Sequence, residues 1–222
     1  MRIVYFDTET TGLDAQQCQI IELAAQAYEG SKKVGEMDDL IRLTDPEATL
    51  PEKIVELTHI TDELLAKEGI AVEEAAKHFA ELCGSGPVIL VAHNAQFDLG
   101  FITWTFARHY RQGLEVISRA DYLDTLTIAK DRKAYPHTLA AMIEYYGLNA
   151  QNSHRAIDDV DALVKLFQAM IKERDDIREY INVFGYNPKY GISGRELKKV
   201  RYISQPYIDQ MATAEDILPR RK

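Results

Sequence analysis

The sequence is poor in cysteine, and this scarcity already excludes several kinds of protein. Only Cys18 and Cys83 occur among 222 residues, far apart and outside any Cys-x-x-Cys spacing. Two isolated cysteines cannot form the disulfide framework of a small secreted domain or supply the paired thiolates of a structural zinc site. We therefore expect two small buried side chains in a reducing compartment, which predicts a cytoplasmic protein.

Long apolar runs are also missing. No stretch comes near the roughly 18 to 20 consecutive apolar residues of a membrane-spanning helix, and residues 1–7 carry charge at both ends instead of a basic run that feeds an apolar one. The sequence therefore predicts no membrane segment and no export signal. With 46% hydrophobic and 27% charged residues, its composition is that of an ordinary globular protein.

Positive charge is scarce as well. The chain has 26 Lys and Arg against 35 Asp and Glu, which gives a net charge of −9 at pH 7. This balance argues against a coat of positive charge that binds nucleic acid nonspecifically. It does not exclude a nuclease whose metal ions supply the positive charge near the substrate.

Strand-like patterns come first along the chain. Residues 2–10 are rich in β-branched and aromatic residues and end at a Thr-Thr-Gly turn, and two more strand-like runs follow at 19–28 and 34–43. Three successive strands with short connections predict an antiparallel meander. The unbroken apolar run 87–92 predicts a strand covered on both faces, and a short strand or turn is expected near 122–125.

Helical patterns alternate with the later strands. They predict helices at 51–57, 62–67, 72–82, 97–110, 138–146 and 155–172, with Thr61 as a helix cap. A meander followed by alternating strands and helices predicts an α/β fold in which helices flank a mixed sheet. The composition shifts near Glu173, so we divide the chain into a domain at 1–174 and a short C-terminal extension at 175–222.

Two carboxylates end the first predicted strand. Asp7 and Glu9 are two residues apart, so their side chains project to the same side of the sheet. Neighbouring carboxylates repel each other, which raises a pKa or recruits a cation. Such a pair alone more often marks a solvated strand end, but this one ends an apolar strand and precedes Thr-Thr-Gly.

Further acids follow later in the chain. Asp98 comes just after the buried strand, where a helix begins, so it either complements the helix dipole or belongs to a site at the carboxyl end of the sheet. In the last predicted helix, a rotation of about 100° per residue places Asp159 at the edge of the apolar stripe, at about −60° from Ala156. Asp158 and Asp161 fall at about 200° and about 140° and are expected to face solvent.

Three motifs together resemble the DEDDh 3′→5′ exonucleases. Residues 6–12 read Phe-Asp-Thr-Glu-Thr-Thr-Gly, residues 93–98 read His-Asn-Ala-Gln-Phe-Asp, and His154 with Asp159 forms His-x-Ala-x-x-Asp. Weaker signatures of the same family match at 20–23, 57–61 and 124–126, and the motifs occur in the family's order. The resemblance runs from residue 3 to about residue 172 and implies a ribonuclease-H-like fold. It does not choose the substrate.

The resemblance implies an active site of four carboxylates and one histidine. Asp7, Glu9, Asp98 and Asp159 would hold two Mg²⁺ ions, for which Mn²⁺ would substitute, because hard divalent cations prefer carboxylate oxygens. His154 would be the general base, since an imidazole that titrates near neutrality can take the proton of a water molecule. These five residues are the predicted catalytic set, and the four acids are the predicted metal ligands.

Substrate contacts are expected beside these acids. The backbone after Asp7 would bind a free 3′ hydroxyl, and Gly12 would let the chain approach the strand closely. In the family an apolar residue at the Leu13 position packs against terminal bases, so Leu13 is either such a wedge or a turn residue docked on the core. Phe97 would stack on a base or, as we favour, join the core. The predicted substrate-binding set is Thr8, Thr10, Gly12, Leu13, His93, Asn94 and Phe97.

The histidines other than His154 carry less weight. His93 belongs to a family motif, and its alternative reading is a structural role, which we favour. His78, His109 and His137 lie outside the motifs and are expected at the surface.

These residues predict a metal-dependent 3′→5′ exonuclease that releases nucleoside 5′-monophosphates from single-stranded or frayed DNA 3′ ends. An RNA-trimming exoribonuclease, such as an oligoribonuclease, is the alternative, and it differs in whether the site accepts a 2′ hydroxyl. A noncatalytic nucleic-acid-binding module is disfavoured, because it has little use for four converging acids. The expected partner is a nucleic acid with a free 3′ end, and action inside a polymerase or repair complex stays open.

The extension is basic and rich in tyrosine. Residues 185–222 hold eight Lys or Arg against four Asp or Glu, and five of the 12 tyrosines lie in 175–222. Basic residues attract phosphates and aromatic rings stack on unpaired bases, so one hypothesis is a track for a single strand. The alternatives are tyrosines that pack the extension onto the domain and a surface for a protein partner.

Overall fold

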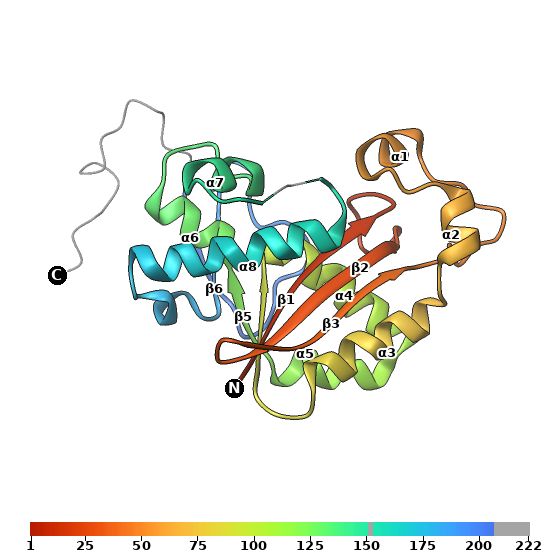
Figure 1. Cartoon of the computed structure of the whole chain (residues 1–222), viewed down its shortest axis with the longest axis horizontal. Coiled ribbons are helices and arrows are strands. Elements are labelled where there is room, and N and C mark those ends of the chain that lie inside the picture. Colours follow the sequence, from red (N-terminus) through yellow and green to blue (C-terminus); the bar gives the residue numbers. More distant parts are fainter. Residues whose placement is uncertain (151–152, 207–222) are drawn as a thin grey trace.

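A five-stranded mixed sheet forms the centre of the protein. The structure is a computed structural model that describes residues 1–150 and 153–206 (Figure 1). The strands run in the order β3-β2-β1-β4-β5, where β1, β2 and β3 pair antiparallel and β4 and β5 join β1 in parallel. This arrangement confirms the predicted meander followed by parallel strands. The strand bounds are β1 (Arg2–Thr10), β2 (Ile20–Glu29), β3 (Lys32–Leu40), β4 (Val88–Ala92) and β5 (Asp121–Asp124).

The third strand ends earlier than predicted. β3 stops at Leu40, whereas the sequence pattern extends to Leu43. Ile41 instead forms an isolated parallel bridge with Ile70, just before α3, so the apolar residue after the strand pairs with a different segment. The apolar pattern therefore predicts that Ile41 is buried, but it does not predict which segment Ile41 pairs with.

Two helical layers cover the two faces of the sheet (Figure 1). Successive residues of a strand point to opposite faces, so Phe6 packs under α3 and α4, while Tyr5 packs under α8. A smaller cluster around Ile21 and Ile60 lies beneath α1 and α2. The helix bounds are α1 (Glu52–Thr58), α2 (Asp62–Glu68), α3 (Val72–Cys83), α4 (Ala95–His109), α5 (Leu114–Arg119), α6 (Thr125–Arg132), α7 (Leu139–Tyr145) and α8 (Ala156–Glu173), with a 3₁₀ turn η1 (Arg111–Gly113).

The helix starts show why these segments fold as they do. Thr61 caps α2 by accepting a hydrogen bond from the backbone N–H of Leu64 at 3.2 Å, as predicted. The sequence patterns missed α5 and α6. Asp124 caps α6 by accepting bonds from the N–H groups of Leu126 and Thr127, so the residue that ends β5 also starts this helix. The apolar pattern of α6 is weak because polar residues fall on its buried side, Thr127 among them.

The described part of the extension, residues 175–206, packs onto the domain. It forms a 3₁₀ turn η2 (Ile177–Tyr180) and a parallel pair of strands, β6 (Val183–Tyr186) and β7 (Arg201–Ser204). Tyr180, Val183 and Phe184 are buried, and β6 lies against β5 and α6. No helix among the residues that the structure describes is both long enough and apolar enough to cross a membrane.

Candidate active site

Four carboxylates meet at one end of the sheet. Asp7 and Glu9 lie at the end of β1, Asp98 in the first turn of α4 and Asp159 in the first turn of α8. Asp98 and Asp159 are buried, whereas Asp7 and Glu9 are partly exposed. The register between β1 and β2 shifts after Glu9, and such bulges re-aim side chains beside sites. The fold thus places acids from three separate motifs around one point.

Asp98 is held against the first strand by hydrogen bonds. Its Oδ1 accepts from the backbone N–H of Thr8 at 3.1 Å and from the Thr8 hydroxyl at 2.7 Å. Thr8 therefore positions the Asp98 carboxylate. The substrate contact expected of Thr8 stays a prediction. Both readings of Asp98 have support: it lies in the first turn of α4, and its charge helps to raise the pKa of Asp7 in the acid cluster.

The helix-phase prediction for α8 is confirmed. Asp159 is 5% exposed and faces the sheet, while Asp158 and Asp161 are exposed. Asp158 accepts a hydrogen bond from the Ser153 hydroxyl at 2.6 Å, and Asp161 accepts one from Gln26 at 2.6 Å. Both outer acids therefore have partners away from the cluster.

A buried glutamate fixes the start of α8, and the sequence patterns did not assign it a role. Glu22, opposite Glu9 on β2, is fully buried and accepts from the Arg155 side chain at 2.9 and 2.6 Å and from the backbone N–H of Ala156 at 2.8 Å. These bonds satisfy a free N–H of the helix start and place His154 and Asp159 relative to β1. The weak family signature at 20–23 was the available signal for Glu22.

Without a cation, the ionised carboxylates of the cluster repel one another and are unfavourable. Burial, followed by the charges of Asp98, Asp159 and Glu9, raises the pKa of Asp7 well above its ordinary range. Burial and the neighbouring acids raise the pKa of Glu9 to about 8. Burial raises the pKa of Asp98 to about 7 against the opposing hydrogen bonds from Thr8. Acids in such surroundings hold protons or bind cations at neutral pH.

The donor set fits hard divalent cations. The four side chains offer carboxylate oxygens alone, which suits Mg²⁺ or Mn²⁺ better than soft metals. Glu9, Asp159 and His154 each place one potential ligand atom so that the three atoms lie within 4.8 Å of one another. The residues present therefore fit the predicted metals, and the mutual repulsion of the acids gives a physical reason for binding them.

His154 sits at the exposed edge of this cluster. Its backbone adopts a left-handed φ of 55°, which is uncommon outside glycine and often accompanies functional sites. Its side chain is exposed, yet a ring nitrogen lies near the oxygens of Glu9 and Asp159. This position suits either a general base or an imidazole ligand that adds to the four carboxylates.

The predicted substrate residues after Asp7 divide into two kinds. Leu13 is 88% exposed, so it does not dock on the core, and an apolar side chain there is free to contact a substrate. Thr10 donates its hydroxyl to the carbonyl of Gly12 at 2.7 Å and shapes the turn. A Cβ at Gly12 would lie 2.7 Å from the sulfur of Cys18, so packing within the turn already requires glycine at this position.

Phe97 joins the core, as favoured, and its stacking on a base stays a prediction. It is half-buried and packs against the core beside Phe101, with ring centroids 4.9 Å apart, and the rest of its surface remains accessible.

His93 and Asn94 mainly build the turn before α4, the helix that carries Asp98. Asn94 adopts a left-handed φ of 72°, and its N–H donates to Asp124 at 2.9 Å. His93 bonds to the Thr125 hydroxyl at 3.0 Å and to the carbonyl of His137 at 2.8 Å. The surface prediction for His137 is wrong: it is 6% exposed, because its ring packs inward and bonds to the carbonyl of Lys133 at 2.8 Å.

The tyrosines of the extension do not act alike. Tyr180 is buried and bonds to Asp131 and Arg174, and the Tyr202 hydroxyl donates to Gln96 at 2.7 Å. Tyr186 and Tyr190 line a cavity next to His154. Tyr207, the fifth, lies outside the described residues. The packing hypothesis therefore holds for part of the extension, while another part faces open space near the acids.

Comparison with known sequences places these residues in a family. A family model for exonucleases of the ribonuclease T type matches residues 4–167, which is most of the chain. The DNA polymerases III of PolC type from Staphylococcus haemolyticus and Staphylococcus aureus are each 35% identical over 176 residues. That match covers 78% of this chain and 12% of the polymerases, so the chain spans a small part of their length.

Solved structures share the fold. The zinc-bound E. coli ExoI–ssDNA complex superposes with a TM-score of 0.72 at 16% identity, covering 81% of this chain and 42% of that one. Exonuclease X in complex with 5′ overhanging duplex DNA gives a TM-score of 0.60 at 22% identity, covering 81% of this chain and 96% of that one. The mixed sheet with its flanking helices is thus ribonuclease-H-like, as predicted.

Proposed function

This chain belongs to the DEDDh 3′→5′ exonuclease family, and from that membership we propose that it releases nucleoside 5′-monophosphates from DNA 3′ ends with the help of two divalent cations. The observation that carries the proposal is the convergence of Asp7, Glu9, Asp98 and Asp159 with His154 at their edge. A binding module would gain nothing from acids that repel one another and raise each other's pKa values.

The four acids would hold the cations, and the surrounding chain keeps the acids in place. When bound, divalent cations neutralise the acids, lower the pKa of a water molecule and stabilise the departing oxygen. Thr8 fixes Asp98, and Glu22 fixes the start of α8 through Arg155 and Ala156. These contacts set the acids before substrate arrives, so little reorganisation remains for the reaction itself.

His154 would take the proton of the attacking water. Its exposed position at the cluster edge leaves room for water and substrate on its open side. The carboxylates of Glu9 and Asp159 lie close enough to stabilise the imidazolium that forms. The phosphorus–oxygen bond to the preceding nucleotide breaks, its 3′ oxygen is protonated, and a nucleoside 5′-monophosphate leaves.

DNA is the proposed substrate. The sequence relatives are DNA polymerases, and the two structural neighbours were solved with single-stranded DNA and with overhanging duplex DNA. Leu13, exposed beside Asp7, suits contact with the terminal base. A polymerase or repair complex as partner stays a prediction, because the chain matches a small segment of the polymerases.

One assay tests the proposal. DNA and RNA oligonucleotides of identical sequence, labelled at the 5′ or the 3′ end, are incubated with the protein and Mg²⁺, with EDTA and the Asp7→Ala variant as controls. We expect 5′-labelled DNA to shorten one nucleotide at a time and 3′-labelled DNA to release a labelled monophosphate at once. Faster cleavage of RNA would contradict the DNA assignment, and metal-independent or internal cleavage would contradict the mechanism.

A further inference from the structure

A cavity of about 560 Å³ has His154 in its lining but none of the four acids of the cluster. Three parts of the chain line it: the loop with Asn94 and Gln96, the segment around Lys130 and Tyr135, and residues 184–193 of the extension. Of the five predicted catalytic residues, His154 alone belongs to its lining. Because His154 belongs both to the cavity lining and to the acid cluster, the cavity adjoins the candidate active site.

The extension is bonded to the helix that carries Asp98. The side-chain amide of Gln96, two residues before Asp98, donates to the carbonyl of Arg195 at 2.7 Å. Its oxygen accepts from the hydroxyl of Tyr202 at 2.7 Å. One glutamine on α4 therefore bonds to Arg195, just after the lining segment, and to Tyr202, which also lines the cavity. These bonds join this part of the extension to the helix that carries Asp98.

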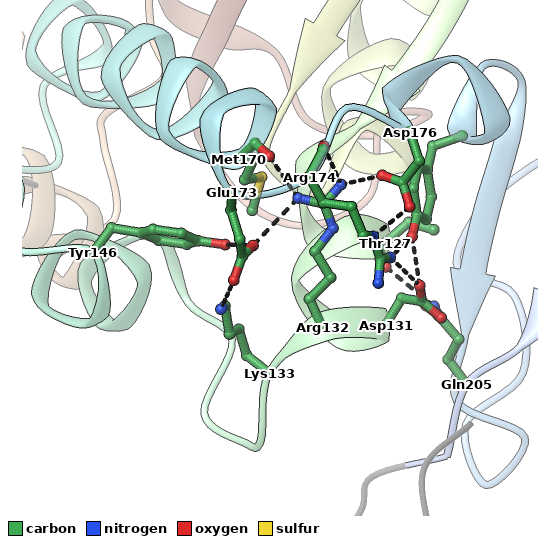
Figure 2. Close-up of polar contacts among 11 residues, drawn as sticks. Thr127, Asp131, Arg132, Lys133, Tyr146, Met170, Glu173, Arg174, Asp176 and Gln205 are labelled. Atoms are coloured by element: carbon green, nitrogen blue, oxygen red, sulfur yellow. Dashed lines mark hydrogen bonds and ion pairs between the residues drawn. The ribbon is translucent and has the colours of Figure 1, made fainter. Parts of the chain in front are cut away.

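A second set of contacts secures the extension to α6. Thr127 accepts a hydrogen bond from the backbone N–H of Gly185 at 2.8 Å through its hydroxyl, and its carbonyl accepts from Gln205 at 3.1 Å. A Cβ at Gly185 would lie 1.5 Å from the Gln205 side chain, so this close contact requires glycine. Figure 2 shows Thr127 and Gln205 beside an ionic network that joins α6, the end of α8 and residues 174–180.

The cavity lining offers stacking surfaces and few charges. Tyr135, Tyr186 and Tyr190 contribute rings, and Tyr190 is 67% exposed at the rim. Lys130 contributes an amine on the inside, and Lys189 places its amine 5.2 Å from the Tyr190 ring. Aromatic rings stack on any unpaired base, and adjacent amines attract its phosphate. The volume falls within the range of about 300 to 1,000 Å³ that is usual for small-molecule ligands, so one nucleoside fits.

We propose that this cavity receives one unpaired base of the substrate strand, on the 5′ side of the scissile bond. The inference rests on the proposed nuclease function and adds the class of substrate to it. Of the predicted substrate-binding residues, His93 and Asn94 line the cavity, so it adjoins the substrate. Leu13, the residue expected against the terminal base, does not line it, and we therefore assign the cavity to a nucleotide further from the end. A base inside it cannot pair with a second strand, and the protein therefore requires single-stranded DNA of more than two nucleotides for full activity.

The test compares substrate lengths in matched variants. Tyr190→Ala removes the ring at the rim, Tyr190→Phe keeps it, and Tyr145→Ala removes a tyrosine of similar exposure, 60%, that does not line the cavity. The measured quantity is kcat/KM for a single-stranded hexanucleotide divided by kcat/KM for a dinucleotide. We expect this ratio to fall about tenfold in Tyr190→Ala, from the typical loss of one stacked base, and to stay at the wild-type value in the other two variants.

A fluorescence measurement locates the base directly. In the inactive Asp7→Ala background with Mn²⁺, 2-aminopurine is placed at each position of a hexanucleotide in turn. We expect quenching at one internal position, lost in Tyr190→Ala and kept in Tyr190→Phe. Quenching by Tyr190 at the 3′-terminal position alone would overturn the proposal, as would an unchanged length ratio in a Tyr190→Ala protein with wild-type Tm.

The two proposals fail in different ways. If the wild-type protein hydrolyses no oligonucleotide of any length, the proposed function is wrong. If it hydrolyses the hexanucleotide and the dinucleotide, but their ratio is the same in Tyr190→Ala and Tyr145→Ala, the nuclease function stands and the base-binding cavity is wrong.

Discussion

The two sides of His154 are built from opposite chemistries. On one side, four carboxylates crowd together at the end of β1, and the pKa values of Asp7, Glu9 and Asp98 are raised, so cations are needed to stabilise the ionised acids. On the other side, tyrosine rings, Lys130 and polar groups line a cavity, and hydrogen bonds with Gln96 and Thr127 hold the extension that forms part of its wall. The acid cluster is therefore incomplete without metal, whereas the cavity is formed by packing alone. The difference separates a site that performs chemistry from a site that recognises a strand.

The largest effect on activity is expected when an acid of the cluster is removed. We expect Asp7→Ala or Asp159→Ala to lose on the order of 10³-fold or more in kcat, because each change removes a ligand of the cations, while Asp158→Ala loses little. Steady-state hydrolysis of single-stranded DNA measures the effect, and EDTA should abolish the wild-type activity until Mg²⁺ or Mn²⁺ is restored. Full activity in Asp159→Ala together with loss in Asp158→Ala would show that the inward-facing acid is not the functional one.

The second test concerns the residue between the two sides. If His154 is the general base, His154→Ala should lower kcat by about 10² to 10⁴-fold at neutral pH, which is the usual contribution of general base catalysis. Binding of Mn²⁺ and of an oligonucleotide should remain, since the role of the base appears only in the reaction. Calorimetric titration decides the matter: a variant that no longer binds Mn²⁺ would make His154 a metal ligand.

The third test weakens the support of the acid cluster without touching an acid of the cluster. We expect Glu22→Gln to reduce the free energy of unfolding by about 1.5 to 3 kcal/mol, because a buried acceptor loses its charge beside Arg155 and the start of α8. Glu29→Gln on the same strand is the matched control, since Glu29 pairs with Arg2 at the exposed end of β2. Urea unfolding of both variants measures the difference, and equal losses would mean that the Glu22 contacts have no special weight.

The fourth test uses pH to separate charge from packing. A carboxyl group with a raised folded-state pKa contributes stability below its unfolded pKa and loses it as pH rises through the folded pKa. With Asp98 at about 7 and Glu9 at about 8, the metal-free protein loses this contribution between about pH 4 and about pH 8.

We therefore expect Mg²⁺ to raise the Tm more at pH 8 than at pH 6. The Mg²⁺-dependent shift is the quantity to measure, because His93 and His137, whose pKa values burial lowers, affect both samples alike. The shift should vanish at both pH values in Asp159→Ala. An equal shift at pH 6 and pH 8 in the wild-type protein would contradict the electrostatic account of the cluster.

The smallest effect is expected at Leu13. Because the side chain is 88% exposed, Leu13→Ala should change the free energy of unfolding by less than about 0.5 kcal/mol. If Leu13 contacts the terminal base, KM for single-stranded DNA should rise severalfold at unchanged Tm. A lower Tm with an unchanged KM would mean that Leu13 has a structural role instead.

Much of this architecture follows from the sequence by itself. The alternating pattern at 2–10 and the apolar run at 87–92 mark the two strands that carry the site, because residue spacing fixes which side chains share a face. Helix periodicity alone separates Asp159 from Asp158 and Asp161. The four candidate acids could be placed for this reason. Asp7 and Glu9 lie on one patterned strand, Asp98 comes after another, and Asp159 lies on a patterned helix.

Tertiary structure decided what depends on contacts between distant segments. Nothing in the local sequence of Glu22 shows that it will bind Arg155, which lies 133 residues later. Likewise, nothing in the sequence around His137 shows that this residue of the loop after α6 will be buried. The cavity next to His154 arises in the same way, since Gln96 meets Arg195 and Tyr202 only after the extension has folded back onto α4 and α6. Local periodicity records which side of an element is buried, whereas the partner that buries it is fixed by the folding of the whole chain.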